Sequence, residues 1–134
     1  MRTSELRERM RQALTRDDAL AAWSLRHFNR TVTLLDVYDP HDPPSDDACP
    51  FVSFELLSHV RGNGTARKSW TFLVVVEVRL PEGVPGEDLA ADLRELAEDC
   101  LLRPGLGKVE TGEDVHEVHE GTFWQNISTV SITR

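Results

Sequence analysis

Hydrophobic and polar residues alternate along two long segments, residues 51–60 and 69–80, which flank a polar turn with two glycines. A period of two is typical of β-strands, and the composition of the turn predicts a long β-hairpin. In the second segment one face is apolar from end to end, and the other face is partly apolar. Such a ribbon needs cover on both faces. We therefore expect Leu57, Leu73 and Val75, on the outer face, to form an apolar patch covered by the chain itself or by a partner.

The same alternation assigns the remaining side chains of the first segment to two faces. Polar residues such as Glu55 and His59 fall on the outer face. The opposite face takes the apolar residues Val52, Phe54, Leu56 and Val60.

Two other regions have the period of an α-helix. The N-terminal apolar positions predict a helix that Ser4 caps, and Thr15 with Asp18 resembles a capping box at which the helix breaks and restarts. The restarted helix is expected to carry Ala19, Leu20 and Trp23 inward. Residues 87–102 form the clearest amphipathic pattern in the chain. Its apolar stripe consists of Leu89, Leu93, Leu96, Ala97 and Cys100.

Three further segments have the composition of strands. Residues 31–38 predict a first strand, and the proline-rich, acidic residues 39–50 predict an extended connection without a helix. Residues 109–118 predict a polar edge strand. Residues 122–133 predict the last strand, with a bulge near residues 126–129 because the apolar positions change phase there.

Length and charge limit the classes of function. The chain has 134 residues, which predicts one domain, and its formal net charge is −8 with only 15 lysines and arginines. This balance argues against a nucleic-acid-binding surface, so we expect no sequence-specific nucleic acid partner. Cys49 and Cys100 are too few for a disulfide framework and predict free thiols in a reducing compartment. No secretory signal and no membrane span is predicted, which favours a soluble, intracellular protein.

The strongest suggestion of chemistry is the pair of histidines His116 and His119, which lie among carboxylates. Imidazoles are ligands for zinc or iron, but residues three apart on a strand point to opposite faces, and no third ligand is apparent. The spacing also departs from the HExxH motif of zinc proteases. Neither cysteine has an activating neighbour. We therefore expect no catalytic residue, no cofactor and no metal, while a small metal-binding protein or enzyme that uses the two histidines stays an alternative.

The turn of the hairpin is the densest basic spot in an acidic chain. It contains Arg61, Arg67 and Lys68, and its GNGTARK sequence lacks the spacing and the strand-to-helix context of a phosphate loop. This composition is compatible with a loop that reaches an acidic partner. We therefore group Arg61, Arg67 and Lys68 with Leu57, Leu73 and Val75 as candidate contact residues.

The order of these elements resembles that of the tail terminator, or tail completion, proteins of long-tailed bacteriophages and prophages. The N-terminal helix with residues 17–22, the proline-rich loop before residues 50–54, the long hairpin, the amphipathic helix and the terminal strand all follow in that order. The resemblance covers nearly the whole chain. It implies a compact α/β subunit whose mixed sheet is backed by helices. Such subunits form a hexameric ring with an acidic lumen, which caps the tail tube and forms the surface for head joining, without catalytic residues.

Pattern and resemblance together predict a single α+β domain over residues 1–134. Its sheet is expected to be mixed, mainly antiparallel, with four to five strands and a long hairpin, backed by an N-terminal helix and one amphipathic helix. The expected partners are further copies of the chain, the tail tube protein and a head-completion or neck protein. The expected location is the virion tail, after synthesis in the bacterial cytoplasm. Another neck or minor tail structural protein, and an unrelated oligomeric binding module, are the other structural alternatives.

Overall fold

The long hairpin predicted from the alternation of residues forms the middle of the sheet. Its strands are β2 (Phe51–Val60) and β3 (Ser69–Arg79), which pair in antiparallel fashion. The structure is a computed structural model that describes residues 1–62, 67–103 and 105–134. The predicted turn residues 63–66 therefore lie outside the described residues.

Four other strands complete a six-stranded mixed sheet in the order β1-β2-β3-β6-β4, with β5 also paired to β6. Strand β1 (Thr33–Leu35) runs parallel to β2, and it is much shorter than the predicted strand over residues 31–38. Strand β6 (Phe123–Thr133) pairs with β3 along its whole length. Its other edge is shared by two short strands, β4 (Lys108–Thr111) and β5 (His116–Glu120). The predicted polar edge strand thus exists, but it is divided into two.

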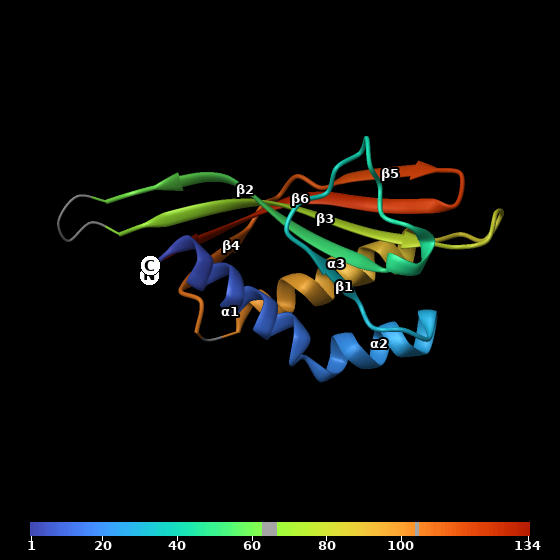
Figure 1. Cartoon of the computed structure of the whole chain (residues 1–134), viewed down its shortest axis with the longest axis horizontal. Helices are drawn as coiled ribbons and strands as arrows, with labels where there is room; N and C mark the ends of the chain where they lie inside the picture. The colour runs from blue at the N-terminus through green and yellow to red at the C-terminus, as the bar shows by residue number, and fades with distance from the viewer. Residues whose placement is uncertain (63–66, 104) are drawn as a thin grey trace.

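Three α-helices, α1 (Thr3–Thr15), α2 (Asp18–Phe28) and α3 (Glu87–Leu102), lie on one face of the sheet (Figure 1). The break between α1 and α2 and the bounds of α3 agree with the predictions. The caps differ, because α1 already begins at Thr3 and its N-cap, Arg2, makes no side-chain cap. Helix α2 is capped by Asp17, whose carboxylate accepts a hydrogen bond from the backbone N–H of Leu20 at 2.7 Å. Ala19, which was expected to face inward, is exposed.

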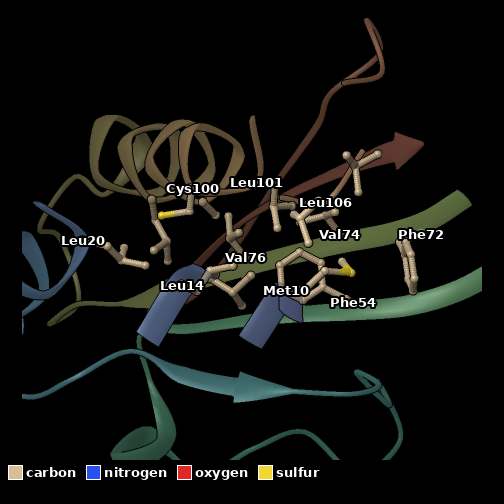
Figure 2. Packing of buried hydrophobic residues seen from close by; sticks show 14 of the residues in the cluster. Met10, Leu14, Leu20, Phe54, Phe72, Val74, Val76, Cys100, Leu101 and Leu106 are labelled. Atoms are coloured by element: carbon tan, nitrogen blue, oxygen red, sulfur yellow. The ribbon is translucent and has the colours of Figure 1, made fainter. Parts of the chain in front are cut away.

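The main core lies between the helices and the sheet face that they cover. Trp70 and Phe72 of β3 are fully buried there at 0% exposure. The strand residues on this face meet the apolar stripes of α1 and α3 (Figure 2). Burial of such side chains contributes about 1.5–3 kcal/mol each, so this layer supplies most of the stabilising burial. The residues labelled in Figure 2 are Met10, Leu14, Leu20, Phe54, Phe72, Val74, Val76, Cys100, Leu101 and Leu106.

A β-bulge at Leu57 reverses the predicted faces of the end of β2. The pairing with β3 shifts between Leu56 and Ser58, so that His59 lies opposite Trp70. The imidazole of His59 therefore stacks on the indole of Trp70 on the helix-covered face, with ring centroids 4.7 Å apart. Val60 moves to the outer face, contrary to the assignment from strict alternation, because one extra residue inverts every later side chain.

The bulge predicted near residues 126–129 of β6 is absent, since β6 pairs with β3 in unbroken register. The apolar positions change phase because polar residues occupy the helix-covered face at this point. Asn126 is buried there, and its amide oxygen accepts a hydrogen bond from Nε of Arg94 at 3.0 Å. The change of phase in the apolar positions of β6 is thus explained by a polar contact with α3, and not by the extra residue of a bulge.

Within the described ranges, no helix has both the length and the apolar character required to cross a membrane.

Candidate interaction surface

The outer face of the sheet, which the helices leave uncovered, is partly covered by residues 36–50, here called the strap (Figure 1). Cys49, Phe51 and Val75 form a small second core beneath it, and Leu73 packs against that core. Tyr38 of the strap stacks on Phe51, with ring centroids 5.5 Å apart. The sequence predicted that this face is covered by the chain itself or by a partner. Part of that cover is the chain's own strap, and the helices contribute none of it.

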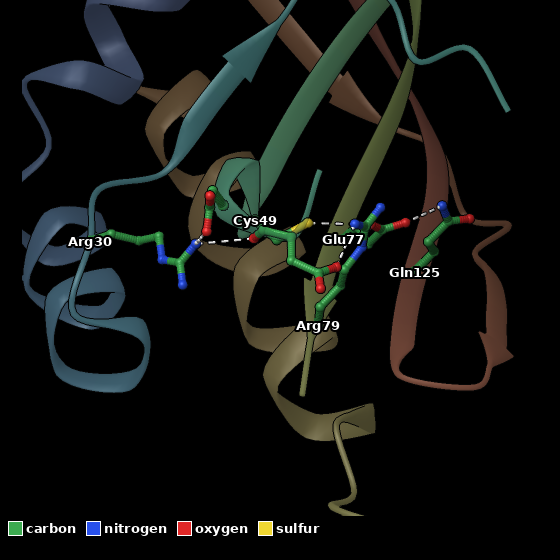
Figure 3. A network of polar contacts seen from close by, with 7 residues as sticks. Arg30, Cys49, Glu77, Arg79 and Gln125 are labelled. Atoms are coloured by element: carbon green, nitrogen blue, oxygen red, sulfur yellow. Dashed lines mark hydrogen bonds and ion pairs between the residues drawn. The ribbon is translucent and has the colours of Figure 1, made fainter. Parts of the chain in front are cut away.

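A buried carboxylate lies at the centre of the strap's contact with the sheet (Figure 3). Glu77 of β3 is only 1% exposed. Its oxygens accept hydrogen bonds from Nε2 of Gln125 at 2.7 Å and from Nε of Arg79 at 2.8 Å. The thiol of Cys49 donates to the same carboxylate at 3.3 Å. A buried charge is tolerated only when it is paired in this way, so the network fixes the strap at one position.

Arginines extend this network to the exposed part of the strap. Nη1 of Arg79 lies 2.8 Å from a carboxylate oxygen of Asp46, and Nη1 of Arg30 donates to the backbone oxygen of Asp46 at 3.0 Å. Asp46 begins a short 3-10 helix of the strap, Asp46–Ala48, and it joins the strap both to Arg30, just after α2, and to Arg79 of β3. The presence of this 3-10 helix is a small departure from the extended connection predicted for residues 39–50.

Both thiols are held in their neutral form. Burial, together with the nearby carboxylate of Glu77, raises the pKa of Cys49 from 9.0 to about 12. Burial, together with Asp17, raises the pKa of Cys100 from 9.0 to about 12. Because the thiolate is the reactive species, neither cysteine has the setting of a catalytic nucleophile. Both are free, in agreement with the prediction from their number and spacing.

The strap does not extend over the outer end of the hairpin, here called the arm, which comprises residues 57–62 and 67–71 (Figure 1). Two apolar side chains are exposed on the arm, Leu57 by 53% and Val60 by 62%. The arm continues the sheet toward its turn, where Arg61 and Arg67 are exposed. It therefore presents apolar surface next to cations in a chain that is acidic as a whole.

The structure separates the six predicted contact residues into three groups. Leu57, Arg61 and Arg67 are exposed on the arm. Leu73 and Lys68 are half-buried, and the backbone of Lys68 pairs with that of Arg134 through hydrogen bonds of 2.8 and 2.9 Å. Val75 is 4% exposed beneath the strap and offers no surface to another molecule. The apolar patch is thus smaller than predicted, and it gains Val60, which strict alternation had placed on the other face.

The two candidate metal ligands lie on opposite faces of β5, as predicted from their spacing. His116 pairs in register with Ile127, and His119 pairs with Trp124. The imidazole of His119 stacks on the indole of Trp124 with ring centroids 3.5 Å apart. Among the described residues, no group of three or more histidine, cysteine or acidic side chains is placed to hold a metal ion. This geometry gives no support to a metal site built on the histidine pair.

Sequence reasoning missed the network around Glu77, although one signal for it was present. A single glutamate within the apolar run of β3 is expensive to bury, and that cost predicts a partner for its charge. The bulge at Leu57 had no comparable signal, since neither glycine nor proline marks it. The bulge arises from the register in which β2 pairs with β3, and the local sequence does not reveal that register.

Comparison of the sequence with family models and with curated proteins gives no match. Function is therefore inferred from the surface and from the order of the elements.

Proposed function

We propose that this chain is a structural protein of long-tailed bacteriophages, which closes into a hexameric ring, caps the tail tube and offers the surface for head joining. The observation that carries the proposal is the one-sided sheet with its exposed arm. Helices α1, α2 and α3 lie on one face, while the arm presents Leu57 and Val60 to solvent on the other. Exposed apolar side chains that are grouped on one projecting element are typical of a protein interface.

The layout of the chain supports the same proposal. Helices α1 and α2, strand β1, the strap, the long hairpin, α3 and the terminal strand follow in the order on which the resemblance to tail terminators rests. Closed rings are built from heterologous contacts, in which one patch of a subunit meets a different patch of the next. An arm at one end of an elongated subunit suits a contact of this kind.

The charge of the chain fits a ring through which DNA passes. A net charge of −8 repels the phosphate backbone, so a lumen lined by these subunits lets DNA move without adhering. The proposed partners are further copies of the chain, the tail tube protein and a neck protein on the head side. The proposal assigns no catalytic residue and no cofactor.

Electron microscopy of the purified chain, alone and mixed with tail tubes, tests this proposal. We expect rings of six subunits, in solution or at one end of each tube, and tubes that no longer elongate once they are capped. Binding to the head connector without binding to tube ends would assign the chain to the neck instead. A chain that neither forms rings nor binds tubes would overturn the proposal.

A further inference from the structure

A hollow of about 240 Å³ lies between β5, β6 and the first turn of α3. Its volume corresponds to about eight water molecules at about 30 Å³ each, which is room for one long side chain. Trp124 and His119, stacked with their planes 6° apart, form an aromatic wall. Glu87 of α3 and Glu117 of β5 also line the hollow. The hollow thus combines an aromatic wall with two negative charges.

The register of the sheet explains why these groups converge. Glu117 pairs with Asn126 and His119 pairs with Trp124, so both side chains point from β5 toward the face that carries α3. Glu87 opens α3 beside them, where its charge also complements the helix dipole. Among the described residues, neither Glu87 nor Glu117 has an ion-pair partner. The nearest arginine of α3, Arg94, is already paired with Glu98 at 3.3 Å and with Asn126.

An aromatic wall beside two carboxylates has the chemistry that a planar cation prefers. A guanidinium group stacks on aromatic faces and pairs with carboxylates. Glu87, Glu117 and His119 are exposed, so another molecule can reach them. The chain itself offers such cations on the arm, where Arg61 and Arg67 are exposed. Figure 1 shows the arm and the turn between β5 and β6 at opposite ends of the long axis. The arm and the hollow of one molecule therefore cannot meet, whereas those of two molecules can.

We propose that the hollow receives an arginine from the arm of a second copy of this chain, with Arg67 as the principal group and Arg61 beside it. The contact is heterologous, because the arm of one subunit meets the opposite end of the next. It rests on the proposed ring and names the surfaces that join its subunits. Repeated from copy to copy, the contact closes a ring if the rotation between subunits permits and otherwise forms a filament.

A charge exchange tests this contact. Glu117→Arg and Arg67→Glu should each weaken self-association at least about tenfold, as like charges meet across an interface. A chain with both substitutions should regain most of the association, because the introduced arginine of one copy then faces the introduced glutamate of the next. Glu110→Arg is the control, since it reverses an exposed carboxylate on the neighbouring edge strand β4, outside the hollow. In the described part of the chain, Glu110 forms an ion pair only with the exposed Lys108, at 3.1 Å. Sedimentation equilibrium measures all four variants against the wild type.

The outcomes separate this inference from the proposed function. Self-association of Glu117→Arg as tight as that of the wild type, or a double variant that associates no better than either single one, would overturn the contact and leave the ring proposal intact. If the wild type is a monomer in solution, Arg67→Cys and Glu117→Cys chains are mixed under oxidising conditions. Disulfide trapping of this pair above that of Arg67→Cys with Glu110→Cys supports the contact, and equal trapping refutes it. Failure to cap tubes would count against the function alone.

Discussion

The two faces of the sheet are covered by different kinds of contact. The face beneath the helices is mainly apolar, with Trp70, Phe72 and Val76 at 0% exposure. Its buried polar residue Asn126 accepts a hydrogen bond from Arg94 of α3. The outer face has a small core under the strap and an arm on which Leu57 and Val60 are exposed. The strap is positioned by the buried charge of Glu77 and its partners.

This difference shows how a small domain folds alone while keeping a surface for assembly. Apolar burial is non-directional and fixes the helices to one face. A charged network is directional, so it fixes the strap without covering the arm. The comparison predicts that substitutions under the helices destabilise the fold, that substitutions in the network release the strap, and that substitutions on the arm affect assembly.

Removal of a buried ring from the helix-covered face should have the largest effect on stability. Phe72→Ala is expected to lower the free energy of unfolding by about 3–5 kcal/mol, because it leaves a cavity in the main core. Thr71→Ala, one residue away on the outer face, is the matched control. It removes one methyl group and a hydroxyl that is hydrogen-bonded to Ser131, and it should cost about 1 kcal/mol. Urea unfolding measures both, and equal losses would show that the two faces contribute alike.

Truncation of the buried carboxylate should have the next largest effect. Glu77→Ala leaves Arg79 and Gln125 without their shared partner and is expected to cost about 3 kcal/mol. Glu77→Gln keeps the shape and some hydrogen bonds, so it should cost less, about 1–2 kcal/mol. Hydrogen exchange should show faster exchange in residues 36–50 of the alanine variant while α1 and α3 stay protected. Uniform loss of protection would mean that the strap is not a separate unit.

Ionisation of the buried thiols should have a smaller effect on the free energy of unfolding, and this effect should be seen only at alkaline pH. Because folding raises the pKa of Cys49 and Cys100 from 9.0 to about 12, the unfolded chain loses these protons first as pH rises. Their contribution to stability is thus complete below pH 9 and is lost progressively up to about pH 12. Urea unfolding of the Cys49→Ala, Cys100→Ala double variant should show a weaker fall in stability over this range. An unchanged slope would show that the thiols ionise normally in the folded chain.

The sequence predicts most of the fold because its elements have clear periods. The stripe of α3 and the alternation of β3 each place side chains on the faces that the structure shows. The break between α1 and α2 is also predicted, although Asp17 and not Thr15 provides the cap. The local sequence is sufficient to predict the buried face of a helix or strand when that element packs against a single core.

The candidate surface is less predictable because it depends on contacts between distant segments. The bulge at Leu57 brings Val60 to the outer face, and the strap buries Val75, and both follow from pairing across the sheet. The hollow beside Trp124 joins residues from α3, β5 and β6, which no single sequence window contains. For Glu77 the sequence did contain a clue, because a charge within an apolar strand is costly to bury without a partner.

Charges introduced at the exposed apolar residues of the arm test most directly whether this surface serves assembly. We expect the Leu57→Glu, Val60→Glu double variant to keep the thermal unfolding midpoint of the wild type, since both side chains are mostly exposed, and to form no rings and cap no tubes. Val37→Glu, equally exposed at 53% but on the strap, should leave assembly intact. Electron microscopy with tail tubes, performed on both variants after their unfolding midpoints are measured, gives the result. Rings or capped tubes from the double variant would contradict the account.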